Sequence, residues 1–260
     1  MLVDSIIKTG PLPAVVFIPA SFSPTSFYNK TIDKLRVIGI EAIIHSLPSA
    51  SRRPPEQAAT LAEDVAYFHD VVAKLVDQGK EVALVMHSYG GIVGTEVCRG
   101  LTKKEREGNG MKGGLVRLVY VTAVVPMLGQ SLNDVLGSPA NLKTQDGYMR
   151  NEPYEDCAKS QFSDLPLQEG VAWVKRMTVH SAASFADKLT FAGYNYLPVS
   201  WLLCEDDHIL TADFQRQTIV MIERESGNKV AVSRLRAGHF PNASIPEDTA
   251  NAIFEAITAE

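Results

Sequence analysis

The chain has 260 residues, a net charge of −5 and a hydrophobic fraction of 45%. Such a chain can build one large core, and its acidic balance argues against a nucleic-acid-binding protein. No apolar run is long enough to cross a membrane, and the N-terminal residues lack the features of a signal peptide. The three cysteines form no CxxC pair, so Cys98 and Cys204 are predicted to be buried free thiols in a reducing compartment such as the cytoplasm.

The first half of the chain alternates between short apolar runs and helical patterns. Buried strands are predicted at residues 14–19, 40–45, 81–87 and 115–125. Helices are predicted at residues 27–39, 56–79 and 90–101. The stretch 101–114 carries basic and acidic residues together and is predicted to be a solvated loop.

The same rhythm returns near the C-terminus. Strands are predicted at residues 198–204 and 229–235, and helices at residues 213–225 and 246–259. Continuous apolar strands separated by helices are typical of a parallel sheet covered on both faces. The sequence therefore predicts an α/β protein with a mostly parallel, doubly wound sheet.

Between residues 126 and 194 this rhythm breaks. Residues 126–170 are polar and rich in turn formers, whereas residues 173–189 have a helical pattern. A long insertion in a compact α/β domain favours a cap over the carboxyl ends of the strands, where ligands bind in such folds. We therefore predict a core of residues 1–125 and 195–260 with an inserted, mainly helical cap of residues 126–194.

The residues HSYGG, at positions 87–91, join the third strand to the next helix. A sharp turn at Ser88 would hold its hydroxyl above the end of the sheet, and the glycines at positions 90 and 91 would let the helix approach closely. Backbone N–H groups at the helix start could receive negative charge. This arrangement suits a serine that attacks a carbonyl, although a serine that only caps a helix has the same pattern.

A nucleophilic serine needs a base, and histidine is the usual one because its pKa of about 6.5 is close to working pH. His239 lies in the loop after the last strand and before the final helix, which suits this role. The other histidines occupy less suitable places: His45, His69, His87, His180 and His208.

An acid that orients the imidazole is expected at the end of the preceding strand. Three neighbouring acids are available there, Glu205, Asp206 and Asp207, and only one of them can take this role. Asp134 follows an earlier strand but lies far into the predicted cap.

The motif M-H-S-Y-G resembles the G-x-S-x-G nucleophile elbow of the α/β-hydrolase superfamily, with Met86 in place of the first glycine. From about residue 13 to the end, the chain is similar to the small cap-bearing branch that includes plant methylesterases and hydroxynitrile lyases. The segments MHSYGG, HSAASF and LLCEDD most resemble the corresponding segments of fungal members. The resemblance implies the α/β-hydrolase fold and no metal or organic cofactor.

The resemblance also implies roles for individual residues. The superfamily order of serine, acid and histidine is met by Ser88, Asp207 and His239, with Asp206 as the second choice for the acid. The backbone N–H groups of Tyr89 and Ser21 are expected to form the oxyanion hole. Phe22 is the next candidate, because the usual His-Gly of this loop is missing.

The function implied is a serine hydrolase that cleaves a small ester or lactone through an acyl-enzyme. Substrate contacts are predicted for Phe22, Trp173, Met177, His180 and Phe240, although ordinary core packing explains most such residues equally well. Other apolar candidates for the pocket are Tyr89, Phe162 and Phe185.

Two other functions share these features. A lyase or cyclase of secondary metabolism could use the same three residues for proton transfer, and a receptor on this fold could bind a ligand without turnover. The expected partner is a small molecule, with neither nucleic acid nor membrane. The oligomeric state stays open, a homodimer being one option.

Overall fold

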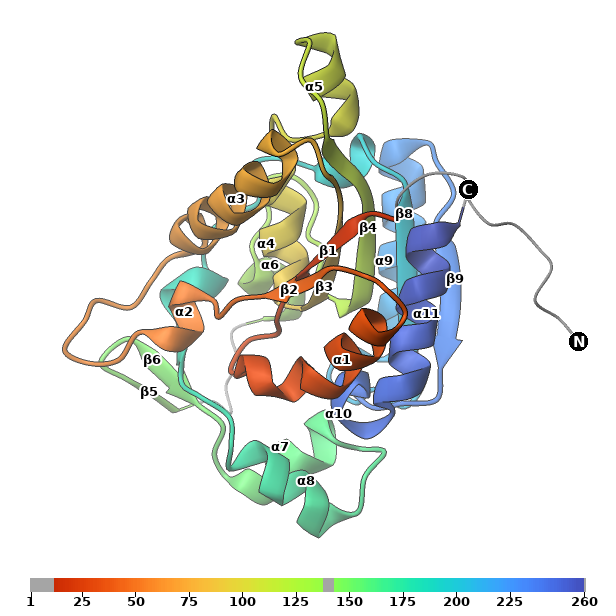
Figure 1. Cartoon of the computed structure of the whole chain (residues 1–260). Coiled ribbons are helices and arrows are strands. Elements are labelled where there is room, and N and C mark those ends of the chain that lie inside the picture. Colours follow the sequence, from red (N-terminus) through yellow and green to blue (C-terminus); the bar gives the residue numbers. More distant parts are fainter. Residues whose placement is uncertain (1–11, 138–142, 260) are drawn as a thin grey trace, which may run out of the picture.

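Six parallel strands form the central sheet of the computed structural model, which describes residues 12–137 and 143–259. Their order is β2-β1-β3-β4-β8-β9 (Figure 1). The strands are β1 (Ala14–Ile18), β2 (Ala42–Ile44), β3 (Glu81–Ser88), β4 (Gly114–Ala123), β8 (Val199–Cys204) and β9 (Ala231–Leu235). The chain first adds β2 on one side of β1. It then crosses to the other side of β1, where it adds β3, β4, β8 and β9 in turn. The order therefore reverses between β1 and β3, which is where open α/β sheets bind ligands.

Side chains of β1 alternate between two hydrophobic clusters, one on each face of the sheet. Val16 and Ile18 belong to the cluster that includes residues of α3 (Leu61–Asp77), α4 (Gly90–Val97) and α9 (Ala212–Ser226). Val15 and Phe17 belong to the other, with residues of α1 (Asn29–Val37) and α11 (Pro246–Thr258). Because both faces of β1 are covered, this strand is an unbroken apolar run, and the predicted doubly wound α/β class is confirmed.

The ends of helix α3 show how local chemistry decides element boundaries. The predicted helix at 56–79 begins only at Leu61, because Thr60 caps it. The Thr60 hydroxyl accepts from the Glu63 N–H, and the Glu63 carboxylate accepts from the Thr60 N–H. The prediction of a solvated loop at 101–114 is wrong in part, since Lys103–Gly108 forms the short helix α5, capped by Thr102.

The insertion between β4 and β8 contains both helices and a small sheet. Its helices are α6 (Leu132–Leu136), α7 (Tyr154–Gln161) and α8 (Leu167–Val174). Its three antiparallel strands are β5 (Lys143–Gln145), β6 (Tyr148–Arg150) and β7 (His180–Ser181). In the view of Figure 1, α7 and α8 lie below α1 and α10 (Pro241–Ser244). An insertion that was expected to be mainly helical therefore also carries an antiparallel sheet.

The helix predicted at residues 173–189 is wrong. Helix α8 ends at Val174, and the chain then becomes extended, with the Thr178 N–H donating to the Phe22 carbonyl at 2.8 Å. His180 pairs with Met149 of β6. Pairing with β6 and the loop after β1 outweighs the local helical pattern, as tertiary context often does. Helices α7 and α8 lie instead in the stretch whose turn formers suggested irregular structure.

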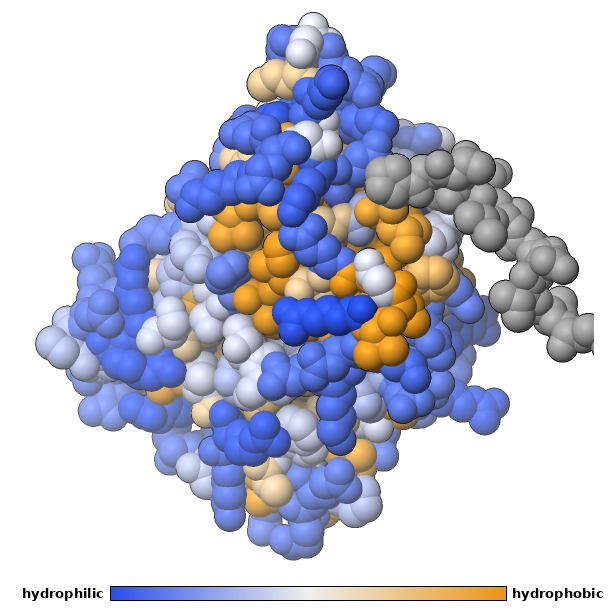
Figure 2. All heavy atoms as spheres, in the orientation of Figure 1, coloured by the Kyte–Doolittle hydropathy of each residue, from blue (hydrophilic) through white to orange (hydrophobic). Residues whose placement is uncertain are grey.

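The surface drawn in Figure 2 is mostly polar, with one apolar area over the region of α1, β1 and β2. Val37 and Ile38, at the end of α1, are exposed. Along the described ranges, no helix combines the length and apolar character that a membrane span requires. The remaining short elements are α2 (Pro48–Ser51) and three 3-10 turns at Thr25–Tyr28, Ala183–Phe185 and Gly193–Asn195.

Candidate active site

Ser88 ends β3 in a backbone conformation that L-amino acids rarely adopt, with φ at 52°. The turn requires glycine at the two positions that open α4. A Cβ atom on Gly90 would lie 2.4 Å from the Ile18 carbonyl oxygen, and one on Gly91 would lie 2.6 Å from that of Val124. Both contacts are closer than any Cβ atom tolerates, so the close approach of α4 to β1 and β4 depends on these glycines. The result is a strained turn that presents the Ser88 hydroxyl at the end of the sheet.

The structure explains the methionine that replaces the first glycine of the elbow motif. Met86 is fully buried, and Gly94, on the facing side of α4, provides the space for it. A Cβ atom on Gly94 would lie 2.2 Å from the Met86 sulfur. In this protein the small residue at the contact is Gly94 of α4 and not a glycine of β3. The strand and the helix can therefore still pack closely.

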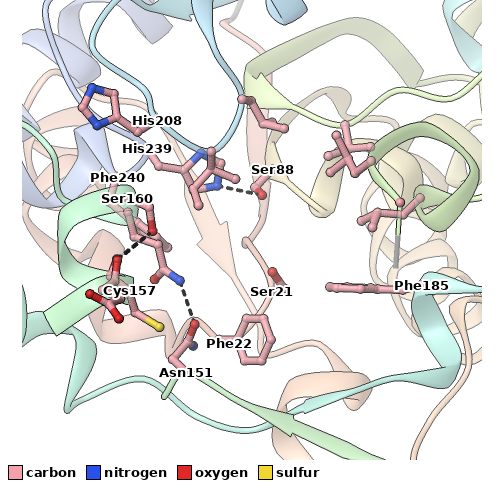
Figure 3. Close-up of a pocket in the computed structure, with 18 of the residues that line it drawn as sticks. Ser21, Phe22, Ser88, Asn151, Cys157, Ser160, Phe185, His208, His239 and Phe240 are labelled. Atoms are coloured by element: carbon pink, nitrogen blue, oxygen red, sulfur yellow. Dashed lines mark hydrogen bonds between the residues drawn. The ribbon is translucent and has the colours of Figure 1, made fainter. Parts of the chain in front are cut away.

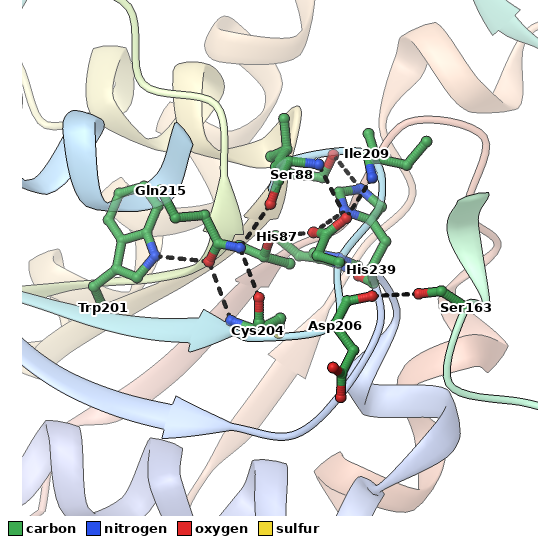
Figure 4. Close-up of polar contacts among 12 residues, drawn as sticks. His87, Ser88, Ser163, Trp201, Cys204, Asp206, Ile209, Gln215 and His239 are labelled. Atoms are coloured by element: carbon green, nitrogen blue, oxygen red, sulfur yellow. Dashed lines mark hydrogen bonds and ion pairs between the residues drawn. The ribbon is translucent and has the colours of Figure 1, made fainter. Parts of the chain in front are cut away.

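Ser88, His239 and Asp207 form a continuous hydrogen-bonded chain (Figure 4). The Ser88 Oγ lies 2.9 Å from His239 Nε2, and His239 Nδ1 lies 2.7 Å from Asp207 Oδ2. Because a carboxylate can only accept, Nδ1 carries the imidazole proton and Nε2 is free to accept the proton of Ser88. All three residues are buried, with 6% of Ser88, 4% of His239 and 2% of Asp207 exposed.

The carboxylate of Asp207 is held by several donors besides His239. The Thr122 hydroxyl donates to Oδ2, and the N–H groups of Ile209 and Leu210 donate to Oδ1 at 2.7 and 2.9 Å. Burial alone would raise the pKa of Asp207, but the charge of His239 and these hydrogen bonds outweigh it and hold the pKa below its usual value. Asp207 therefore stays ionised beside the imidazole.

The two neighbouring acids face elsewhere. The side chain of Asp206 is exposed, while its backbone carbonyl accepts from the Ser163 hydroxyl (Figure 4). Glu205 lies 3.9 Å from Arg234 of β9. Of the three acids at the end of β8, the structure brings only Asp207 to His239.

Gln215 of α9, which the sequence did not single out, braces the loop that carries Asp207. Its side-chain oxygen accepts from the Trp201 indole and the Cys204 N–H, at 3.2 and 3.1 Å. Its amide nitrogen donates to the carbonyls of Cys204 and Leu210, at 2.9 and 2.7 Å (Figure 4). A fully bonded, buried amide fixes both ends of the turn around Asp207.

His87 and Tyr28 form a second buried network that sequence reasoning also missed. His87 Nε2 lies 2.6 Å from the His239 carbonyl oxygen, so this nitrogen must be the donor. His87 Nδ1 then accepts from the Tyr28 hydroxyl at 2.8 Å, and the same hydroxyl accepts from the Ala20 N–H at 2.9 Å. Burial and the nearby charge of His239 lower the pKa of His87 to about 3, which keeps the ring neutral. The network connects the loop after β1 to the backbone of His239.

Replacing Tyr28 by phenylalanine is expected to lower the free energy of unfolding by about 1–3 kcal/mol, because the Ala20 N–H and His87 Nδ1 would be left buried without a partner. Urea denaturation would measure the change. Tyr67→Phe is the matched control, because the Tyr67 side chain is 39% exposed. Equal stability of the two variants would contradict the structural role assigned to this network.

A cavity of about 690 Å³ opens onto the Ser88 hydroxyl (Figure 3). Five of the residues singled out from the sequence line it: Ser21, Phe22, Ser88, His239 and Phe240. Of the other apolar candidates, Phe185 also lines it. The cavity lies at the switch point between β1 and β3, where the strand order places a ligand site.

Three residues predicted to contact substrate lie outside this lining: Trp173, Met177 and His180. Trp173 packs edge-on against Phe27, with ring centroids 4.8 Å apart. The Met177 sulfur accepts from the Asn151 side chain. His180 is fully buried against Phe22, and burial lowers its pKa to about 3. Each of the three side chains thus contacts other protein side chains and does not line the cavity.

Tyr89, one expected oxyanion donor, directly follows Ser88, and Ser21, the other, lies in the loop after β1 and lines the cavity. Within the described residues, no backbone carbonyl accepts from the N–H of either one, so both N–H groups remain available. The buried Tyr89 side chain is anchored by its hydroxyl, which donates to Asp64 at 2.7 Å. Burial raises the pKa of Asp64 to about 6 despite hydrogen bonds from Tyr89 and Ser49. The hydrogen bond to Asp64 thus fixes the Tyr89 side chain, while the Tyr89 backbone precedes the first residue of α4.

No cluster of three or more histidine, cysteine or acidic side chains suited to a metal occurs within the described ranges. Cys98 and Cys204 are free and buried, as predicted, and neither lines the cavity.

Comparison with known proteins connects this geometry to a family. Residues 15–252 match the profile described as Alpha/beta hydrolase family. The "Probable hydrolase R7" of Phoma sp. (strain ATCC 20986 / MF5453) is 35% identical over 246 residues, covering 94% of this chain and 97% of that protein.

Solved structures show the same fold. A pyrethroid hydrolase, PytH, has a TM-score of 0.72 at 18% identity, covering 96% of this chain and 99% of its own. The methylesterase MES16 from Arabidopsis has a TM-score of 0.71 at 15% identity, covering 95% and 99%.

Proposed function

The chain belongs to the alpha/beta hydrolase family, and from this premise we propose that it is a serine hydrolase that cleaves a small carboxylic ester or lactone through an acyl-enzyme. The predicted resemblance to this superfamily is confirmed, and the enzyme is of the esterase-like kind. The observation that carries the finer proposal is the continuous chain from Ser88 through His239 to Asp207 at the mouth of a cavity.

The first half of the reaction forms the acyl-enzyme. Ser88 Oγ attacks the substrate carbonyl carbon while its proton passes to His239 Nε2, 2.9 Å away. The carbonyl oxygen gains negative charge, which the N–H groups of Ser21 and Tyr89 receive. When the intermediate collapses, the bond to the alcohol oxygen breaks, and that oxygen takes the proton from Nε2.

The second half releases the acid. A water gives a proton to His239 Nε2 and attacks the acyl carbon, and the Ser88 oxygen leaves with the returned proton. Asp207 holds Nδ1–H throughout and stabilises the transient imidazolium. With a lactone the alcohol stays attached to the acyl group, and the steps are otherwise the same.

An activity-based experiment tests the proposal. A fluorophosphonate probe is expected to label the peptide that contains Ser88, as read by mass spectrometry, and p-nitrophenyl acetate is expected to give a burst of one p-nitrophenolate per active site. Labelling of a different serine, or hydrolysis that continues after the probe has fully reacted with Ser88, would disprove the assignment. Labelling without any ester turnover would favour lyase or cyclase chemistry instead.

A further inference from the structure

The two expected oxyanion donors lie in different loops, and the spacing of their N–H groups depends on how these loops are held. Ser21 lies in the loop after β1, and Tyr89 lies in the turn after β3. The parallel pairing of β1 with β3 ends at Ile18 and Met86, before either donor is reached. Contacts beyond the paired strands therefore set the position of one loop relative to the other.

The loop that carries Ser21 contains a residue in a strained conformation. The Ser23 N–H donates to the Ala20 carbonyl at 3.4 Å, so Ser21 and Phe22 are the central residues of a turn. Figure 3 shows both of them below Ser88 on the wall of the cavity. The φ of Phe22 is 60°, in the left-handed region that favours glycine. This conformation costs an L-residue about 1–2 kcal/mol, so the packing around Phe22 has to stabilise it.

The segment HSAASF, residues 180–185 of the insertion, supplies much of that packing. The Thr178 N–H, two residues before the segment, donates to the Phe22 carbonyl at 2.8 Å. The His180 ring packs against the Phe22 ring, with centroids 5.3 Å apart. Phe185, at the other end of the segment, meets the same ring edge to face at 6.5 Å. One stretch of chain thus holds both the backbone and the side chain of Phe22.

The same histidine contacts the residue that follows the nucleophile. The rings of His180 and Tyr89 meet edge to face, with centroids 4.8 Å apart. The far end of the Tyr89 side chain is fixed by Asp64, which accepts from its hydroxyl at 2.7 Å. His180 therefore touches side chains of both loops, although it does not line the cavity itself.

A hydrogen bond fixes the orientation of the His180 ring. The Ser184 hydroxyl donates to the Ser181 carbonyl at 2.9 Å, so its oxygen accepts from His180 Nε2–H at 3.1 Å. The ring is fully buried, and burial lowers its pKa to about 3, which keeps it neutral. A neutral, buried ring away from the cavity can influence the reaction only through the residues it packs against.

We propose that His180 is a positioning residue for the oxyanion hole, because its ring connects Phe22, the neighbour of Ser21, to Tyr89. This inference rests on the proposed function, which assigns the N–H groups of Ser21 and Tyr89 to the developing oxyanion. Loss of the ring displaces these donors and weakens the transition state, whereas binding of the uncharged ester is unaffected. Removal of a whole donor typically costs about 10²–10³ in rate, so a displaced donor costs about ten- to a hundredfold.

His180→Leu tests the proposal with propyl trifluoromethyl ketone as a probe of the hole. Ser88 Oγ adds to the ketone carbon, the Ser88 proton passes to His239 Nε2, and the ketone oxygen becomes the oxyanion. The inhibition constant of the ketone is expected to rise by about tenfold or more, and kcat/KM for p-nitrophenyl butanoate to fall by the same factor. In a Ser88→Ala background, the same change should alter the dissociation constant of this ester by about twofold or less, as measured by calorimetric titration.

Further variants separate positioning from stability. His180→Phe keeps an aromatic ring at this place and is expected to restore both quantities to within about threefold of the wild type. His45→Leu is the matched control, because His45 also meets an aromatic ring edge to face, that of Tyr67, and lies outside the cavity lining. If His180→Leu does not fold, Ser184→Ala replaces it, since it removes the acceptor of Nε2–H; equal changes of about two- to fivefold are then expected in both quantities.

An inhibition constant that stays within about twofold while the melting temperature falls would overturn the positioning role, since His180 would then affect stability alone. A fall in kcat/KM without a matching rise in that constant, or a His180→Phe variant as impaired as His180→Leu, would overturn it as well. In each of these cases the wild type still hydrolyses the ester, so the hydrolase assignment stands. A wild type that neither hydrolyses the ester nor binds the ketone at Ser88 would instead overturn both.

Discussion

Ser88→Ala is expected to lower kcat/KM for p-nitrophenyl esters by about 10⁵-fold or more, because His239 and Asp207 then have no hydroxyl to activate. The proposed acyl-enzyme cannot form, and only binding and the oxyanion donors remain to assist attack by water. Steady-state hydrolysis of p-nitrophenyl acetate by the purified variant would measure the loss.

The fold is expected to tolerate this change. Alanine fits the same turn, and the variant loses one hydrogen bond, worth about 0.5–1.5 kcal/mol. Thermal unfolding should therefore remain cooperative, which separates a chemical effect from a structural one. Ser46→Ala, at an exposed serine outside the cavity lining, is the matched control and should keep the wild-type rate. A Ser88→Ala enzyme with more than about a tenth of the wild-type activity would refute the proposed nucleophile.

Asp207→Asn is expected to lower kcat by about 10⁴-fold, because an amide that donates to His239 Nδ1 imposes the wrong tautomer. Nε2 would then carry the proton and could not accept another from Ser88. The variant also loses the negative charge that stabilises the imidazolium. Because the pKa of Asp207 is held low, the wild-type carboxylate remains ionised throughout the neutral range, and the contrast should be clear at pH 7.

Asp206→Asn provides a control of the same chemistry one residue away. The Asp206 side chain is exposed, and the contacts of that residue to Ser163 and Ala237 are made by its backbone. Its replacement should change kcat by about twofold or less. If Asp206→Asn caused the larger loss, the choice of acid would be reversed, and the loop would have to rearrange during catalysis.

Several features follow from short-range patterns and could be predicted. Short apolar runs predict strands of a parallel sheet. Both faces of such a sheet are buried, so apolar and polar residues do not alternate along its strands. The glycines after Ser88 indicate a close helix approach, and the structure shows carbonyl oxygens where their Cβ atoms would lie. The predicted division into a core and a cap of residues 126–194 remains a prediction.

Other features depend on residues far apart in the chain. His87, Tyr28 and Ala20 form one network only because β1 and β3 are neighbours in the sheet. Leu61, at the start of α3, donates its N–H to the Asp187 carboxylate, 126 residues away, and no sequence motif marks this pair. The extended chain at Thr178 contradicts its local helical pattern, because one hydrogen bond to Phe22 and the pairing of His180 and Ser181 with β6 decide its conformation.

The sequence by itself therefore determined the α/β class, the resemblance to the α/β-hydrolase superfamily, and the positions of Ser88 at the end of its strand and of His239 in the loop after the last strand. These depend on periodicity and on local turns, which neighbouring residues specify. Only the tertiary structure decided which acid meets His239 and which side chains line the cavity. Those outcomes are set by contacts between segments that the sheet brings together, and a single sequence does not encode such distances in any local pattern.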